Sequence, residues 1–157
     1  MHTYFITAPR ERPDFRLVIA FLWHDEQNVD TEGNSDHPAS RTWTELYVRN
    51  REREGEVVTV SPHGESPLVL SVQSELRHLA ARVALFLATH CGGGVSADST
   101  GEFLQPDTLL QRVGADFDTS AAFRRVANSP FSRSSLDNPY PNLDRESMLR
   151  AKKSLGL

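Results

Sequence analysis

The feature that most constrains the fold is the stretch 74–94, which combines a helical apolar repeat with three consecutive glycines. Apolar residues recur every three or four positions over 76–87, which places them on one stripe of an α-helix. Ser74 is the expected N-cap, with Glu75 just inside the helix, where the macrodipole favours an acid. Gly92 is expected to end the helix in a left-handed conformation.

Strand-like segments lie on both sides of this helix. Residues 16–23 (RLVIAFLW) form a continuous apolar run with β-branched and aromatic members, which predicts a buried strand. The alternating segment 42–49 and the run 56–61 predict a β-hairpin. Residues 68–72 and 95–98 predict strands that flank the helix, so 68–98 is expected to fold as strand–helix–strand.

After residue 98 the sequence predicts only short helices and an extended segment. Short helices are expected at 106–113 and 119–128, the second capped by Thr119 or Ser120. The fold class expected is α+β, an antiparallel-rich sheet of about four or five strands with one main helix packed on it and short C-terminal helices. Residues 1–128 are expected to form a single domain. Residues 129–157 are expected to add an extended segment and a terminal helix at 144–154, packed on the same domain.

Charge is concentrated in one place. The stretch 24–36 contains five acidic residues and neither lysine nor arginine, and it lies in a segment, 24–41, that has no apolar periodicity. We therefore expect 24–41 to be a long acidic loop, a kind of loop that is often functional. No basic face is visible, so direct nucleic-acid binding is not expected.

The 157 residues contain no apolar run long enough to span a membrane. The N-terminus lacks the long apolar core of a signal peptide, and the single cysteine, Cys91, cannot form an intramolecular disulfide. These features lead us to expect a cytoplasmic protein.

The residues that could carry chemistry do not match the spacing or position that the known motifs require. The glycines 92–94 follow a helix, whereas a phosphate-binding loop precedes one. Cys91 lies at the end of the helix where the dipole disfavours a thiolate. The cluster at 24–37 could hold a cation, but its spacing does not match a calcium loop. The cluster at 24–37 consists of His24, Asp25, Asp30, Glu32, Asp36 and His37. We expect no cofactor, no metal ligand and no catalytic residue, and therefore not an enzyme.

One segment resembles a known group of proteins. The stretch 74–98 (SELRHLAARVALFLATHCGGGVSAD) is similar to part of short bacterial immunity proteins from polymorphic toxin systems, of the type VI or contact-dependent kind. The resemblance implies a role in neutralising a partner, and it transfers no functional residue, because such proteins bind through variable surfaces. The matching positions are Leu79, Ala80, Ala84, Leu87, Ala88, Gly92, Gly93, Val95 and Asp98.

The leading hypothesis is a binding protein that neutralises a cognate bacterial toxin or effector by occluding its active site through the acidic loop 24–41. An acidic surface would steer association with a basic partner, such as a nuclease with a basic site. The alternatives are a small metal-dependent enzyme that uses the cluster at 24–37, or a structural component of a secretion or phage assembly. The expected partner-binding residues are Asp25, Glu26, Asp30, Glu32 and Asp36, with Trp43 and Tyr47 as anchors.

Overall fold

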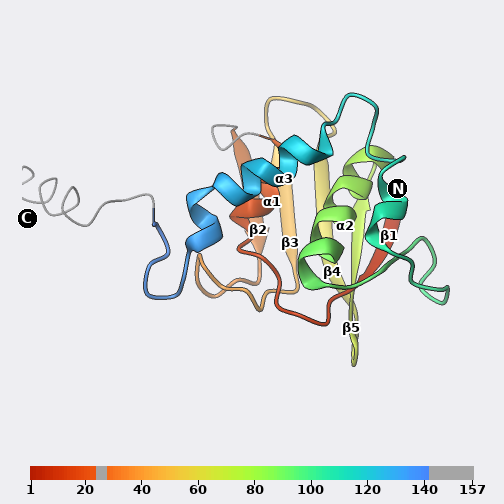
Figure 1. Ribbon diagram of the computed structural model, residues 1–157, viewed down its shortest axis with the longest axis horizontal. Coiled ribbons are helices and arrows are strands. Elements are labelled where there is room, and N and C mark those ends of the chain that lie inside the picture. Colours follow the sequence, from red (N-terminus) through yellow and green to blue (C-terminus); the bar gives the residue numbers. More distant parts are fainter. Residues whose placement is uncertain (24–27, 142–157) are drawn as a thin grey trace, which may run out of the picture.

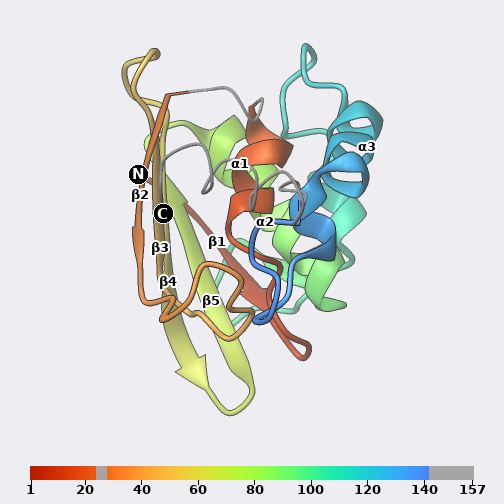
Figure 2. The same ribbon diagram turned by 90° about the vertical axis from the view of Figure 1, so that its left-hand side faces the viewer.

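The computed structural model describes residues 1–23 and 28–141. In this part of the chain, six strands form one sheet in the order β2-β3-β4-β5-β1-β6, and every neighbouring pair is antiparallel. The described helices gather on one face of the sheet, and no described helix covers the other face, which we call the open face (Figures 1 and 2). The strands are β1 (His2–Thr7), β2 (Val29–Gly33), β3 (Leu46–Asn50), β4 (Val57–Glu65), β5 (Leu68–Ser74) and β6 (Val95–Ser96).

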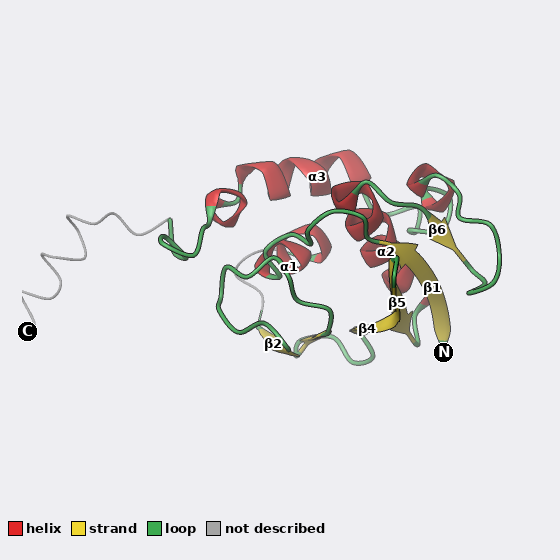
Figure 3. Ribbon diagram, turned by 90° about the horizontal axis from the view of Figure 1, so that it is seen from below, coloured by secondary structure: helices red, strands yellow, loops and turns green. Residues whose placement is uncertain are grey.

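The helical layer consists of three α-helices and two short 3₁₀ turns within the described residues. The longest helix, α2, lies over β1, β4 and β5, whereas α1 packs against both α2 and α3. Figure 3 shows this layer on one side of the strands. None of these helices is long and apolar enough to cross a membrane. Their bounds are α1 (Arg16–Leu22), α2 (Arg77–Cys91), η1 (Pro106–Leu109), α3 (Thr119–Asn128) and η2 (Pro130–Arg133).

The α+β class and the antiparallel sheet are confirmed, but the sheet has six strands in the described residues rather than four or five. The two additional strands are β1 and β2. In β1, polar residues such as Thr3 and Thr7 alternate with the buried Tyr4 and Ile6, so the segment has too little apolar character to stand out. β2 lies inside the stretch that was expected to be entirely loop.

The prediction of a strand at 16–23 is wrong, because this segment forms α1. Continuous apolar runs occur in buried helices as well as in buried strands. Here α1 is covered by both α2 and α3, and this burial removes the polar stripe that would have revealed a helical period. Two residues before the helix, Oδ1 of Asp14 accepts a 3.0 Å hydrogen bond from the backbone N–H of Arg16, the first residue of α1.

The hairpin predicted at 42–61 is confirmed by the pairing of β3 with β4, in which Leu46 lies opposite Val60. β4 continues to Glu65, beyond the predicted end at residue 61. The resulting β4–β5 hairpin projects past the end of the neighbouring strands (Figure 2).

The main helix is confirmed, although it begins at Arg77 rather than just after Ser74. Ser74 is the last residue of β5, and its hydroxyl accepts a 3.1 Å hydrogen bond from the N–H of Leu76. Gly92 ends the helix with φ of 68°, as its expected left-handed conformation requires. The returning strand covers only 95–96.

The C-terminal elements differ from expectation in helix type and in capping. The helix predicted at 106–113 is a single 3₁₀ turn, η1. α3 has the predicted bounds, but its cap is Asp118, whose Oδ1 accepts a 3.0 Å hydrogen bond from the N–H of Ala121. The terminal helix expected at 144–154 lies outside the described residues.

Candidate functional site

The open face of the sheet presents the residues that alternate with the core. In β3 and β4, the side chains of Val48 and Val60 are buried under the helices. Tyr47 and Thr59 alternate with them and lie opposite each other in the β3–β4 register, so both occupy the open face. Open faces of antiparallel sheets are commonly solvated, and this one carries hydroxyl-bearing and charged side chains at its β2 end.

Strand β2 brings two of the expected acidic residues onto this face. Asp30 lies opposite Arg49, and Glu32 lies opposite Tyr47. Cross-strand partners share a face, so both carboxylates are placed beside the β3 side chains. β2 is the outermost strand at this side of the sheet.

The two carboxylates have different electrostatic surroundings. Oδ1 of Asp30 lies 2.5 Å from Nη2 of Arg51. The hydrogen bond from Arg51, together with the positive charges of Arg51 and Arg49, lowers the pKa of Asp30. The charge of Asp30 is therefore largely balanced within the protein. Glu32 makes no ion pair with any residue that the structure describes.

A shallow groove of about 350 Å³ runs beside Glu32. Its rim includes a second carboxylate, Glu45, which also makes no ion pair with the described residues. Tyr47 lines the groove together with the hydroxyl-bearing side chains of Thr59 and Ser61. We define the acidic groove by these five residues. It places two carboxylates that make no ion pair with the described residues beside one aromatic ring.

Backbone geometry fixes the position of Glu45. Oδ1 of Asn34 accepts hydrogen bonds of 2.9 Å from the N–H groups of both Thr44 and Glu45. Gly33 must be glycine, because a Cβ there would lie 2.4 Å from the carbonyl oxygen of Glu45. Glu45 was not among the expected site residues. Its position two residues before Tyr47 in the alternating segment is the signal that could have identified it.

The other expected site residues do not join this groove. Trp43 is only 1% exposed, and its indole N–H donates a 2.8 Å hydrogen bond to the carbonyl of Pro13, so its assignment as a partner-binding anchor is wrong. Asp36 is exposed in a separate hollow that is also lined by Arg16 and His37. Asp25 and Glu26 lie outside the described residues. The expectation that 24–41 is one loop is wrong for Val29–Gly33, which is strand β2.

The metal-dependent alternative rested on the cluster at 24–37. Within residues 1–23 and 28–141, no three His, Cys, Asp or Glu side chains lie close enough together to hold a metal ion. Asp30 is engaged by Arg51, and Nδ1 of His37 accepts a 3.1 Å hydrogen bond from the N–H of Ala39. His24 lies outside the described residues.

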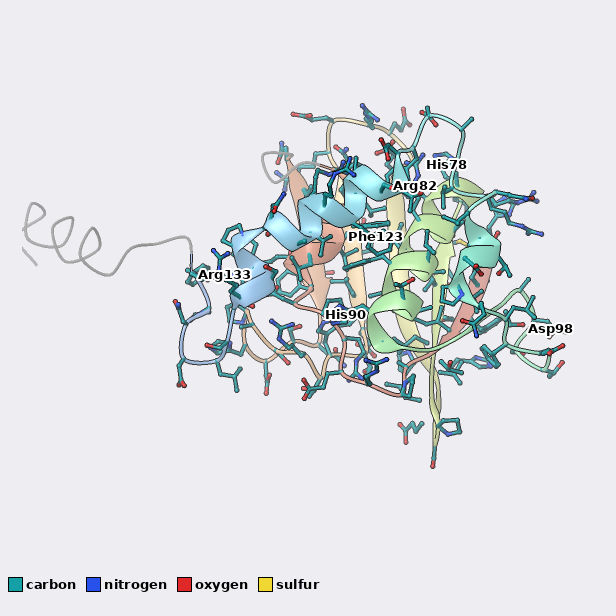
Figure 4. The ribbon with its side chains drawn as sticks, viewed as in Figure 1. His78, Arg82, His90, Asp98, Phe123 and Arg133 are labelled. Atoms are coloured by element: carbon teal, nitrogen blue, oxygen red, sulfur yellow. The ribbon has the colours of Figure 1, made fainter. Side chains whose placement is uncertain are left out.

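Conspicuous polar residues of the helical layer serve the fold. Nε of Arg82, on α2, donates a 2.7 Å hydrogen bond to the carbonyl of Val113, and its guanidinium lies 4.2 Å from the ring centre of Phe117. In Figure 4, His78, His90 and Asp98 lie well apart from one another. Arg82 therefore connects α2 to the segment that precedes α3.

The glycine run and Cys91 occupy the C-terminal end of α2. Gly93 allows close packing on β1, because a Cβ there would lie 1.8 Å from the carbonyl oxygen of Thr7. Cys91 is buried, and desolvation raises its pKa to about 11. The thiol is therefore protonated at neutral pH, and Cys91 belongs to the core, whereas the glycines serve to end α2 and to pack closely on β1.

Comparison of the chain with protein-family models, with curated proteins and with solved structures gives no match. The candidate site consequently depends on the geometry and charge of this chain alone.

Proposed function

We propose that this protein is a binding protein that neutralises a cognate bacterial toxin or effector by covering the toxin's active site with the acidic groove. One observation carries the proposal. Glu32 and Glu45 flank Tyr47 on the open face of the sheet, and neither carboxylate forms an ion pair with the described residues.

Carboxylates that make no ion pair with the described residues favour a basic partner for two reasons. They raise the rate of encounter through long-range attraction, and they select against acidic surfaces. A nuclease presents such a basic surface, because its active site must bind phosphate groups. Carboxylates on a rigid sheet can occupy the positions of those phosphates and block access to them.

Tyr47 supplies the second part of the proposed contact. Tyrosine is enriched at the centres of protein interfaces because its ring buries a large area while its hydroxyl forms a hydrogen bond. Here the ring side chain is half-buried in the sheet between two acidic neighbours. Little side-chain entropy is lost when a partner covers it. The similarity of 74–98 to immunity proteins supports the same role.

The experiment begins with capture of the product of the neighbouring gene by the full-length protein. Isothermal titration calorimetry then compares wild type with Glu32→Lys and Glu45→Lys. Each reversal is expected to raise Kd at least tenfold, and wild-type affinity is expected to fall as salt rises. Glu102→Lys is the matched control, because Glu102 is an exposed acid outside the groove and its reversal changes net charge equally.

Two results would contradict the proposal. The first is that the neighbouring gene product is not captured. The second is that Glu32→Lys and Glu45→Lys lower affinity no more than Glu102→Lys does, which would show that only overall net charge matters.

A further inference from the structure

The backbone of β2 uses only half of its hydrogen-bonding groups within the sheet. The N–H of Arg51 donates to the carbonyl of Asn28 over 2.9 Å, and the N–H of Asn34 donates to the carbonyl of Glu45 over 3.3 Å. In an antiparallel ladder, alternate residues point these groups to the same side. The even-numbered residues of 28–34 therefore point their N–H and C=O groups toward β3.

The odd-numbered residues Val29, Thr31 and Gly33 consequently point their N–H and C=O groups away from β3. No other described strand pairs with β2 on that side. Thr31 and Gly33 are exposed, and Val29 is half-buried. An edge with free donors and acceptors is a template for one more strand.

The charges on β2 disfavour a second copy of this chain as that strand. A two-fold antiparallel pairing centred on Thr31 would place Asp30 of one copy opposite Glu32 of the other. Like charges directly opposite each other destabilise a strand pair. A basic partner strand would instead place Lys or Arg beside Glu32, which makes no ion pair with a described residue.

The inner side of the same edge has room for an apolar side chain. A hollow of about 140 Å³ lies there, lined by Phe15, Thr31 and Leu46, among others. Side chains of an added strand alternate between the two faces of the sheet. A segment that alternates basic and small apolar residues would place the basic ones on the open face and the apolar ones toward this hollow.

We propose that β2 binds an extended segment of the partner protein as an additional strand, with basic residues on the open face and small apolar residues on the inner face. This inference rests on the proposed function and identifies how the partner is held. The hydrogen bonds come from the N–H and C=O groups of Val29, Thr31 and Gly33. The basic side chains lie beside Glu32 and the acidic groove.

The test uses the full-length protein and the synthetic peptide acetyl-Thr-Lys-Val-Lys-Val-Lys-Thr-amide. Amide hydrogen exchange followed by NMR is measured with and without peptide. Exchange of the Thr31 and Gly33 amides is expected to slow at least tenfold on binding. The amides of Asp30 and Glu32, which already face β3, are expected to change less than twofold.

Two variants separate strand addition from simple charge attraction. Thr31→Pro removes one edge-facing N–H and no β2–β3 hydrogen bond, and proline is tolerated at such edge positions. It is expected to weaken peptide binding at least tenfold, whereas Thr31→Val, which keeps the N–H, is expected to bind within twofold of wild type. A peptide N-methylated on alternate residues keeps every charge and is expected to lose binding. This arm remains informative if Thr31→Pro does not fold.

Four outcomes would overturn strand addition. The first is that the peptide does not bind at millimolar concentration, and the second is that Thr31→Pro and the N-methylated peptide both bind as tightly as the wild-type protein binds the unmodified peptide. The third is slow exchange of the edge amides in the free monomer, and the fourth is a concentration-dependent dimer in which these amides exchange slowly. The third would mean that the chain covers its own edge, and the fourth that a second copy does. If the captured partner responds to Glu32→Lys but not to Thr31→Pro, the proposed function stands and only strand addition fails.

Discussion

The hydroxyl of Ser134 donates a 2.6 Å hydrogen bond to Oδ2 of Asp14 and so joins two residues that are 120 positions apart. The Asp14 side chain is completely buried and also accepts two hydrogen bonds, of 2.9 and 2.6 Å, from the guanidinium of Arg16. The same guanidinium lies 3.9 Å from the ring centre of Phe131. The start of α1 and the segment around η2 are therefore held by one shared carboxylate.

Replacement of Asp14 should be among the most damaging single changes outside the apolar core. We expect Asp14→Ala to lower the free energy of unfolding by about 3–5 kcal/mol, because it leaves the mostly buried guanidinium of Arg16 without its partner. Ser134→Ala removes one hydrogen bond to a charged group and should cost about 1.5–3 kcal/mol. Urea unfolding measures both, with the exposed Asp137→Asn as control. A loss below about 1 kcal/mol for Asp14→Ala would contradict this account.

Trp43 and Tyr47 should separate stability from binding. Trp43 is buried, so Trp43→Ala is expected to cost about 3–5 kcal/mol of stability. Tyr47 lies on the open face, and Tyr47→Ala should cost about 1 kcal/mol. Thermal unfolding gives the stabilities, and calorimetry with the captured partner gives the affinities. The proposed function requires Tyr47→Ala to weaken binding while the protein stays folded.

The two glycines at the end of α2 should respond differently to alanine. Gly92→Ala places a Cβ on a left-handed residue, which costs roughly 1–2 kcal/mol, and its contacts are with the flexible Arg10 side chain. Gly93→Ala drives a Cβ into the backbone of Thr7, which cannot yield without moving β1. Gly93→Ala should therefore be the more destabilising in chemical denaturation. The reverse order would show that the helix end can shift away from β1.

Cys91 should be unreactive in the native protein. Burial raises its pKa to about 11 from the ordinary 9.0, so the native thiol keeps its proton when an unfolded thiol would lose it. The unfolded state then binds fewer protons above pH 9, and the stability contributed by the protonated thiol is lost progressively between about pH 9 and 11. Iodoacetamide at pH 8 should label urea-unfolded protein at least a hundredfold faster than native protein. Cys91→Ser provides the baseline for the pH dependence of stability.

Local pattern accounts for part of the fold. α2 was predictable because its apolar stripe repeats over four turns and ends at a glycine, and the β3–β4 hairpin was predictable because alternation in 42–49 meets a second strand after a short turn. The prediction of a strand at 16–23 fails because five of the seven residues of α1 are buried, which leaves too few exposed positions to reveal a helical period. The burial of Trp43 could not be predicted because only the tertiary fold brings Pro13 to its indole N–H and Arg12 to its carbonyl oxygen.

The acidic groove, too, was predictable only in part. The sequence by itself determined that acidic residues are concentrated before β3, and that Glu45 and Tyr47 share a face of an alternating segment. Only the tertiary structure decided that 29–33 pairs with β3, which sets Glu32 beside Tyr47 and leaves Asp30 to Arg51. Strand register and ion pairing depend on which segments meet in space, and a one-residue slip would move every side chain to the opposite face.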